Sequence, residues 1–277
     1  MNKENPIGII GLGAVGSALK HTCEYFHKDV RGYDIKESYD WVPLLDCTVV
    51  FVCVPTPGGT DGRLDCSAIN HVLARLARDD FKGVVAIKST VRAGFMLSAK
   101  LGYPSLRLVY CPEFIRERSG LQWMICPDRV VLAGEPNDVR IVLDVLNWVE
   151  DAKVILTDYS SAEVGKLAHN AYVATKVSFT NEMESICMDL GANPDDVMEI
   201  ITADRRVICK EHLRPHLGPY GGKCVPKDTR ELMNASKSSH LLKAVESVNL
   251  KASEHKGDNM TVEHEGVKKD AWAAVRQ

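Results

Sequence analysis

The residues best suited to covalent chemistry lie in one short stretch, Gly221 to Asp228, which reads GGKCVPKD. Pro226 suits the first turn of a helix, so Cys224 would lie at the N-terminus of that helix, with Lys227 nearby. A helix N-terminus and a neighbouring cation both favour the thiolate, the nucleophilic form of cysteine. Asp228 could point back toward the same site as a base or as a group that orients water. We therefore predict that Cys224 is a nucleophile and that the other eight cysteines are buried structural thiols.

Lys166 and Asn170 are spaced four residues apart, so they project from one face of the helix predicted over 161–190. For the pair alone, a solvated lysine and a surface asparagine are the simpler interpretation. That interpretation weakens here because the surrounding helix is rich in Ala, Val and Phe and poor in charge. A lysine on a largely covered helix usually needs a partner or a chemical role. The pair is therefore a second candidate for the site.

A glycine-rich turn near the N-terminus has the pattern of a dinucleotide-binding fingerprint. It follows a predicted strand and opens a predicted helix, so the helix N-terminus would face a pyrophosphate. A second strand, Val30 to Tyr33, ends at Asp34, whose carboxylate would bind a ribose 2′-hydroxyl and repel a 2′-phosphate. The alternative is a structural glycine turn beside a surface aspartate. The strand, the glycine turn, the helix and Asp34 together favour NAD as the cofactor. The turn consists of Gly11, Leu12, Gly13, Ala14, Val15 and Gly16.

The elements that must position these motifs indicate an α/β fold: a Rossmann-type, mostly parallel sheet followed by an all-helical part. Short apolar runs alternate with helical stretches up to about residue 156, as in βαβ units. We predict strands over 7–10, 30–33, 48–54, 84–87, 106–110 and 129–132, with helices over 14–26, 66–77 and 136–149. Further along the chain we predict helices over 161–190, 195–201 and 226–252.

This change of pattern predicts three parts of the chain. Residues 1–156 would form an NAD-binding Rossmann domain, and residues 157–252 would form a helical domain with catalytic and dimerisation roles. Residues 253–277 are polar and rich in charge, with a short apolar piece at 271–275, so we expect a mobile tail that could end in a helix.

The composition excludes several classes of protein. The chain has 277 residues, is 45% hydrophobic and carries a formal net charge of −3, which argues against a nucleic-acid-binding protein. No apolar run approaches the roughly 20 residues of a membrane span, and the N-terminus lacks the apolar core of a signal peptide. Nine cysteines without a C-x-x-C pair argue against a disulfide framework and a zinc site. We therefore expect a cytoplasmic globular protein that binds no metal, nucleic acid or membrane.

Further strings of the sequence occur in an order that is more specific than any single motif. They are VPTP at 54–57 with Asp61, Gly62 and Asp65, KSTV at 88–91, PEFIRE at 112–117, PDRV at 127–130, Glu163 with Lys166 and Asn170, and Phe179 with Asn181 and Glu182. Together with GLGAVG and GGKCVPKD, they resemble the UDP-glucose/GDP-mannose dehydrogenase family over about residues 6–250. In that family the matching strings read GxGYVG, VPTP, KSTV, PEFLRE, PxRI, E-x-x-K-x-x-x-N and GGxCxPKD.

The resemblance implies a Rossmann domain followed by a helical domain similar to the central domain of 6-phosphogluconate dehydrogenase-like proteins. It implies NAD-dependent, four-electron oxidation of a nucleotide sugar's primary alcohol to a uronic acid, foremost UDP-glucose to UDP-glucuronate for polysaccharide biosynthesis. In this chemistry the Cys224 thiolate attacks an intermediate aldehyde, and the thiohemiacetal is oxidised to a thioester that water hydrolyses. A two-electron alcohol dehydrogenase needs no covalent cysteine, so the cysteine selects the four-electron chemistry.

The resemblance also assigns roles to single residues. Lys166 and Asn170 would stabilise the developing oxyanion. Asp228 would orient water or accept a proton with Thr90 in the same network, and Glu113 would assist thioester hydrolysis. Besides the glycine turn and Asp34, the cofactor would contact Val54, Thr56, Pro57, Ser89, Thr90 and Glu117, and the substrate would contact Glu113, Phe114, Ile115, Arg116, Glu117, Lys166, Asn170, Tyr220, Gly221 and Gly222.

The sequence departs from the family's pattern at several points. The connector between Asp34 and Asp46 is short, residues 92–95 replace the expected Pro-x-Gly-Thr, and Trp123 lies near an expected aspartate. The stretch 216–220 matches its counterpart only in part. The family's third domain, a second Rossmann-like unit that grips the nucleotide, has no counterpart in these residues, and a partner could supply it.

Three functions stay open at this point. The chain could be a compact nucleotide-sugar dehydrogenase, complemented by a partner or acting on a smaller sugar. It could be a two-electron dehydrogenase of the β-hydroxyacid type, or an NAD-binding protein without turnover. We also expect a homodimer, because the resembling family pairs through its helical region. The helix predicted over 226–252 carries apolar side chains on overlapping faces, namely Leu241, Leu242, Val245 and Val248.

Overall fold

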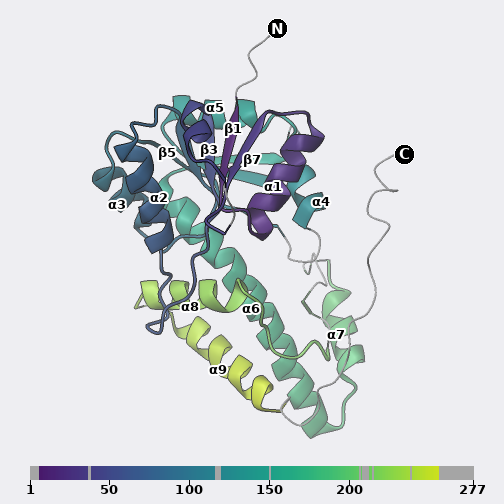
Figure 1. The fold of residues 1–277 in the computed structure, drawn as a ribbon. Helices are drawn as coiled ribbons and strands as arrows, with labels where there is room; N and C mark the ends of the chain where they lie inside the picture. The colour runs from purple at the N-terminus through teal and green to yellow at the C-terminus, as the bar shows by residue number, and fades with distance from the viewer. Residues whose placement is uncertain are drawn as a thin grey trace. The chain divides into compact units, whose positions relative to one another are not determined.

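The computed structural model describes residues 6–36, 39–115, 120–149, 151–205, 207, 212–213, 215–237 and 239–255. Its strands are β1 (Ile7–Ile10), β2 (Val30–Tyr33), β3 (Val49–Val52), β4 (Val84–Ile87), β5 (Arg107–Tyr110), β6 (Arg129–Gly134) and β7 (Lys153–Thr157). They form one sheet in the order β2-β1-β3-β4-β5-β6-β7 (Figure 1). Neighbours run parallel except β5 and β6, so the predicted mostly parallel sheet is confirmed.

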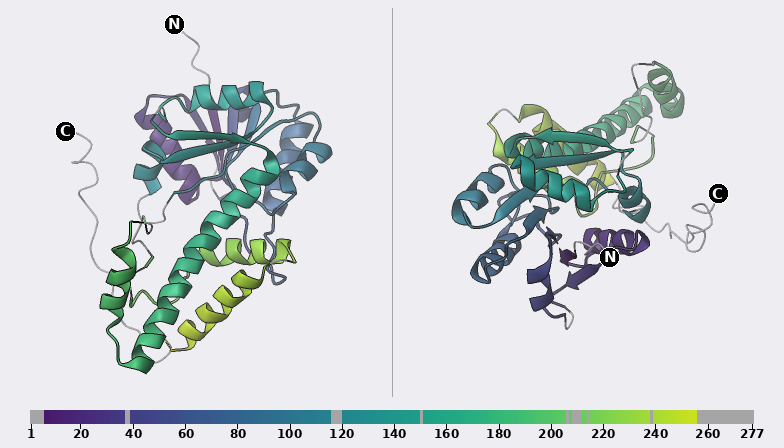
Figure 2. Two further views of the ribbon diagram at one scale, coloured as in Figure 1. Left: turned by 180° about the vertical axis from the view of Figure 1, so that it is seen from behind. Right: turned by 90° about the horizontal axis from the view of Figure 1, so that it is seen from above.

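Helices pack on both faces of this sheet (Figures 1 and 2). The connections contain α1 (Ala14–Tyr25), the 3₁₀ helix η1 (Val42–Asp46), α2 (Ser67–Arg78), α3 (Phe95–Gly102), α4 (Gly120–Ile125) and α5 (Pro136–Val145). The helical part contains α6 (Tyr159–Leu190), α7 (Pro194–Thr202), α8 (Val225–Ala235) and α9 (His240–His255). None of the helices in the described ranges is both long and apolar enough to cross a membrane.

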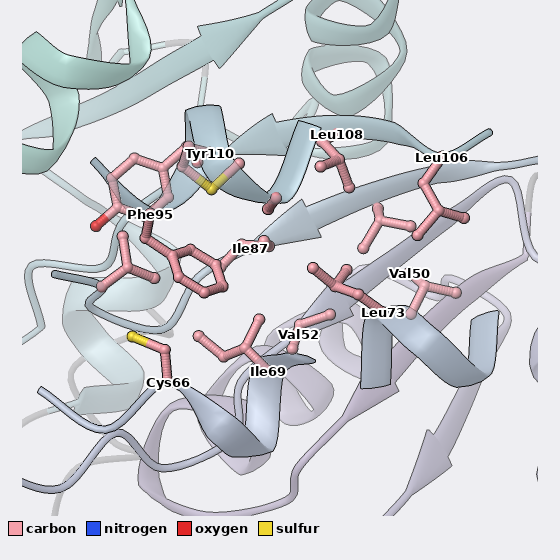
Figure 3. Packing of buried hydrophobic residues seen from close by; sticks show 14 of the residues in the cluster. Val50, Val52, Cys66, Ile69, Leu73, Ile87, Phe95, Leu106, Leu108 and Tyr110 are labelled. Atoms are coloured by element: carbon pink, nitrogen blue, oxygen red, sulfur yellow. The ribbon is translucent and has the colours of Figure 1, made fainter. Parts of the chain in front are cut away.

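The central strands are buried on both faces, which is why their sequences are almost entirely apolar. Val50 and Val52 of β3 point into one cluster with side chains of α2 and α3, part of which Figure 3 shows. Val49 and Phe51 point into a second cluster with side chains of α1, α4 and α5. Burial of both faces fixes the register in which the strands pair. The residues that follow the parallel strands therefore gather at one edge of the sheet, where the strands have their carboxyl ends.

The chain folds into two compact units. The first comprises Met1–Lys176 and Gly221–Lys243, and so contains the whole sheet, the first part of α6, and α8. The second comprises Val177–Tyr220 and Ala244–Gln277. Within the second unit, the Ser178 hydroxyl donates a hydrogen bond to the Val245 carbonyl. The boundary predicted at residue 157 is the point at which strands give way to helices. The two compact units instead divide the chain after Lys176, Tyr220 and Lys243.

The helix predicted over 226–252 is wrong as a single element, because α8 ends at Ala235 and α9 begins at His240. Ser236 has the extended conformation φ −136°, ψ 144°. Serine side chains compete for backbone hydrogen bonds and so favour helix ends over helix interiors. The α9 helix also continues to His255, past the predicted start of the tail, and the apolar piece at 271–275 lies outside the described residues.

Candidate active site

The glycine turn between β1 and α1 has the geometry that a bound dinucleotide requires. Gly11 has a φ of +91°, a conformation that other residues rarely adopt. A Cβ on Gly16 would lie 1.8 Å from the Gly11 carbonyl oxygen, so only glycine allows α1 to pack this closely. Beside Gly13, by contrast, a Cβ would meet nothing within 4 Å. The turn is therefore tight on its inner side and open where a pyrophosphate would approach the helix N-terminus.

Asp34 lies at the carboxyl end of β2, next to this turn. Its carboxylate accepts hydrogen bonds from the Lys36 N–H at 2.9 Å and from the Leu12 N–H at 2.8 Å. These two donors, in that order of effect, lower the pKa of Asp34 below its ordinary value. An ionised carboxylate here fits a ribose hydroxyl and repels a 2′-phosphate. The residues present thus fit NAD, and they would hold its pyrophosphate at Gly13 and its ribose at Asp34.

Other predicted cofactor residues gather at the same edge of the sheet, in the segments after β3 and β4. The Ser89 hydroxyl donates to the Val54 carbonyl at 2.7 Å, and the Thr56 hydroxyl donates to the Thr90 carbonyl at 2.7 Å. The carbonyl of the neighbouring Pro57 accepts a hydrogen bond from the Asp65 N–H, further along the same loop. The structure therefore brings the VPTP and KSTV strings together, while Glu117 lies outside the described residues.

A pair of glycine variants tests the turn. We expect Gly16→Ala to destabilise the protein by more than about 2 kcal/mol, because its Cβ would overlap a backbone oxygen. Gly13→Ala has open space for its Cβ, so its unfolding free energy should change by less than about 1 kcal/mol. NAD affinity should nevertheless fall in Gly13→Ala, because the methyl group enters the expected pyrophosphate space. Urea unfolding and calorimetric NAD titration measure the two effects, and equal unfolding free energies for the two variants would contradict the assignment.

The α6 pair meets α8 through a buried hydrogen bond. Lys166 and Asn170 are each 7% exposed, and Asp228 is fully buried. The Asn170 amide donates to Asp228 Oδ2 at 2.6 Å, and the Lys227 ammonium lies 2.6 Å from Asp228 Oδ1. An asparagine amide has a second N–H, so Asn170 can hold Asp228 and still donate to a ligand. The structure therefore brings the second candidate pair to the predicted Cys224 stretch.

Lys166 has the electrostatics of a functional lysine. Burial is the largest cause, and it lowers the pKa of Lys166 below its ordinary value. The charges of Asp228, Cys224 and Glu113 act in the opposite direction, which shows that all three lie close enough to interact with it. The Lys166 ammonium also faces the ring of Phe114, 4.9 Å from its centre. Lys166 thus interacts electrostatically with three other predicted catalytic residues, Asp228, Cys224 and Glu113.

Cys224 is the N-cap residue of α8 and is exposed. The Asp228 N–H donates to the Cys224 carbonyl, so the aspartate lies one helical turn from the thiol. Among the other described cysteines, burial raises the pKa of Cys23 and Cys53 to about 12, as expected for inert thiols. Cys126 is the exception, because it is also exposed.

Glu113 lies in the segment after β5 and completes the site. Its carboxylate is 2.8 Å from the Lys88 ammonium, and its other oxygen accepts from the Phe114 N–H at 2.8 Å. The Phe114 ring also faces the Arg129 guanidinium at 4.1 Å, whereas Ile115 packs against the core. Arg116 and Glu117, the remaining predicted residues of this segment, lie outside the described residues.

The three predicted substrate residues before Cys224 have different surroundings. Tyr220 belongs to the second unit, where its hydroxyl donates to Glu246 at 2.5 Å and its N–H donates to Asn249 at 2.7 Å. Gly222 has a φ of +77°, and a Cβ on Gly221 would meet nothing within 4 Å. Gly221 therefore leaves open space, Gly222 has a backbone conformation that favours glycine, and Tyr220 is held by α9.

Two fully buried carboxylates lie near the site: Glu163, which the sequence analysis named only as part of a motif and without a role, and Glu231, which it missed. Glu163 accepts from the Gly94 and Met96 N–H groups at 2.7 and 2.6 Å, and so caps the N-terminus of α3. Glu231 of α8 accepts from the Leu64 N–H at 2.7 Å and from the Arg63 guanidinium at 3.2 Å. The spacing offered a signal for Glu231, because it lies three residues after Asp228 on the same helix face.

Glu231→Ala should therefore loosen α8 from the loop that follows β3. The variant leaves the Leu64 N–H without its buried acceptor, so we expect a loss of about 2 kcal/mol in the free energy of unfolding. Arg63 is 37% exposed and can turn to water, which keeps the loss moderate. Urea unfolding measures it. Glu199→Ala, at an exposed position of α7, is the matched control and should change stability by less than about 0.5 kcal/mol; equal losses would contradict the assignment.

The NAD binding domain of the UDP-glucose/GDP-mannose dehydrogenase family matches residues 41–149, and the central domain of the same family matches residues 160–251. The two matches together span most of the chain. They agree with the resemblance drawn from the motifs and confirm NAD as the cofactor.

Among curated proteins, UDP-glucose 6-dehydrogenase YwqF of Bacillus subtilis is 33% identical over 218 residues, which are 74% of this chain and 49% of YwqF. UDP-glucose 6-dehydrogenase AglM of Haloferax volcanii is 30% identical over 241 residues, which are 79% of this chain and 56% of AglM. The chain thus spans about half the length of the curated relatives it matches.

Among solved structures, a UDP-glucose dehydrogenase from Pyrobaculum islandicum has a TM-score of 0.78 at 25% identity, over 92% of this chain and 69% of that one. A 3-hydroxyisobutyrate dehydrogenase from Mycobacterium tuberculosis has a TM-score of 0.66 at 15% identity, over 92% of this chain and 94% of that one. The second likeness shows the fold alone, a sheet domain followed by a helical domain.

Proposed function

The chain belongs to the UDP-glucose/GDP-mannose dehydrogenase family, and on that basis we propose that it oxidises the primary alcohol of a nucleotide sugar to the carboxylate. We propose UDP-glucose as the substrate and UDP-glucuronate as the product, in keeping with the names of its relatives. The observation that carries this proposal is the exposed Cys224 thiol at the start of α8, one turn from the Asp228 carboxylate that Asn170 holds. Such a nucleophile converts an aldehyde into a thiohemiacetal that can lose a second hydride, whereas a two-electron oxidation has no use for it.

The glycine turn and Asp34 would hold NAD, and two NAD molecules bound one after the other would each take up one of the two hydrides that this oxidation releases. In the first half of the reaction, the substrate alcohol loses its hydroxyl proton and a hydride from C6 and becomes an aldehyde. The Cys224 sulfur then forms a bond to the aldehyde carbon, and the carbonyl oxygen takes up negative charge. Lys166 and Asn170 supply donors to that oxyanion from a largely buried position, where such interactions are strongest.

The second half converts the thiohemiacetal into the product. Loss of the second hydride leaves a thioester on Cys224, and water must then attack its carbonyl carbon. Asp228 and Glu113 are the carboxylates available to orient that water and accept its proton. The carbon–sulfur bond breaks, the thiolate of Cys224 is restored, and the acid leaves as the carboxylate.

The amount of NADH formed for each substrate molecule consumed tests this proposal. Two NADH and a carboxylate product from UDP-glucose are the expected result. One NADH, unaffected by Cys224→Ala, would replace the proposal by a two-electron oxidation of the β-hydroxyacid type. NAD binding without turnover across a panel of nucleotide sugars would indicate an NAD-binding protein that is not an enzyme by itself.

We propose that the chain acts as a homodimer in the cytoplasm, and that further residues or a partner contact the nucleotide. The relatives are about twice as long as the matched segment, which supports a contribution from outside it. Of the apolar face predicted for pairing, Leu241 is 65% exposed, whereas Val245 is buried within the second unit. Light scattering at micromolar concentration should give the mass of a dimer, and a monomer would contradict this part of the proposal.

A further inference from the structure

Lys88 is a buried cation that the reaction described above does not use. It follows β4 directly, and its side chain is 6% exposed. Its ammonium lies 2.8 Å from Glu113 Oε2 and 3.8 Å from the Cys111 sulfur, both in the segment after β5. The interaction therefore crosses from the end of one strand to the end of its neighbour in the sheet.

The groups around Lys88 keep it charged. Burial acts against the ammonium, but Cys111, Glu113 and Cys53 act for it, and their combined effect raises the pKa of Lys88 above its ordinary value. The ammonium also lies 6.0 Å from the centre of the Phe51 ring, on the β3 side. Glu113 is the carboxylate at ion-pair distance from this cation, so it is the direct charge partner of Lys88.

The pair is asymmetric, because the cation is closed off while the carboxylate reaches the surface. The Glu113 side chain is 13% exposed, compared with 6% for Lys88. The other oxygen of the Glu113 carboxylate accepts a hydrogen bond from the Phe114 N–H. Both carboxylate oxygens therefore have a partner that fixes the orientation of the side chain. Buried ion pairs add little stability over apolar side chains of the same size. A pair built this way is better explained by a use for the Glu113 charge than by stability.

We propose that Lys88 is a positioning residue that pairs with the Glu113 carboxylate and orients it as the base for hydrolysis of the Cys224 thioester. This inference rests on the proposed function. In the step, a water oxygen bonds to the thioester carbon while one water proton moves to the Glu113 carboxylate. The carbon–sulfur bond breaks, and its electron pair leaves on the Cys224 sulfur. The positive charges of Arg129 and Lys166 also act on Glu113, so Lys88 should account for part of its charge stabilisation and for most of its orientation.

The acyl-enzyme provides the first test. In Lys88→Met, we expect steady-state turnover to fall by about 10²-fold, the lower end of a general-base contribution. Intact-mass spectra of samples quenched during turnover with UDP-glucose and NAD should show the thioester on Cys224 in the variant and far less of it in wild type. Lys88→Arg keeps a cation beside the carboxylate and should restore turnover to within tenfold of wild type. Lys82→Met, at an exposed ion pair, is the matched control. A Lys88→Met variant that behaves like Lys82→Met would overturn the proposal.

A second test needs no turnover. Lys88→Met leaves Glu113 without its cation, so adding Glu113→Gln should raise the urea midpoint of that variant, although Glu113→Gln lowers it in wild type. If the change in urea midpoint of the double variant equals the sum of the changes in the two single variants, Lys88 and Glu113 are not coupled. That result would overturn the proposal even if activity changed. The double variant holds no unpaired buried charge, so it keeps the comparison possible if Lys88→Met folds poorly. If wild type forms no NADH, the proposed function fails and the hydrolytic role of Lys88 fails with it, whereas the urea cycle still decides whether the two charges are coupled.

Discussion

Replacing Cys224 by alanine should abolish carboxylate formation, lowering its rate by on the order of 10⁴-fold or more, as removal of a covalent nucleophile does in other enzymes. Without the sulfur, no thiohemiacetal forms, and the aldehyde has no activated path to the second oxidation. At most one NADH for each substrate molecule should appear in a single turnover. The fold should be unaffected, because Cys224 is exposed and its side chain makes no capping hydrogen bond to α8.

Cys126 offers the matched control for this variant. It is also exposed, and it lies at the end of α4 rather than at the start of α8. Cys126→Ala should therefore keep turnover within twofold of wild type, and iodoacetamide should inactivate wild type and Cys126→Ala alike. Carboxylate formation by Cys224→Ala at more than a hundredth of the wild-type rate would show that the cysteine is not the nucleophile.

Much of the fold could be predicted because its central strands obey one strong rule. Strands buried on both faces must be apolar throughout, and β1, β3 and β4 were located within two residues for that reason. β7 was missed because it lies at the sheet edge, where Lys153, Val154 and Leu156 are exposed and the pattern fades. The division of the long C-terminal helix was missed because the prediction followed the apolar residues on both sides of the break and did not weigh the serines at 236, 238 and 239, which favour a helix end.

The candidate site was predictable where chemistry depends on local spacing, and not where it depends on contacts between distant segments. Cys224 and Asp228 are one turn apart, so the sequence alone placed them together. Glu231 binds Leu64, which is 167 residues away, and Lys88 binds Glu113 across two strand ends. Such pairs depend on the strand order, which the local pattern does not contain. The burial that lowers the pKa of Lys166 likewise became visible only in the folded chain.

The second large effect should come from Lys166. We expect Lys166→Met to lower kcat by about 10²- to 10³-fold, the cost of losing one preorganised donor to an oxyanion. The neutral side chain can still pack against the Phe114 ring, so the loss should reflect missing charge rather than missing volume. Lys176→Met is the matched control. Lys176 lies on the same helix with its ammonium 5.3 Å from the centre of the Tyr172 ring, and this variant should keep kcat within twofold.

The dependence of kcat on pH provides a further test of the role of the Lys166 charge. Burial lowers the pKa of Lys166, so its ammonium loses its proton at a lower pH than that of an exposed lysine. Oxyanion stabilisation needs the charged form, so kcat should be full below that pKa and should fall as the pH rises through it. Lys166→Arg keeps its charge at all these pH values, and its alkaline fall in kcat should disappear even if the maximum is lower. An alkaline limb that stays in place in Lys166→Arg would assign the titration to another group and would leave Lys166 with a structural role.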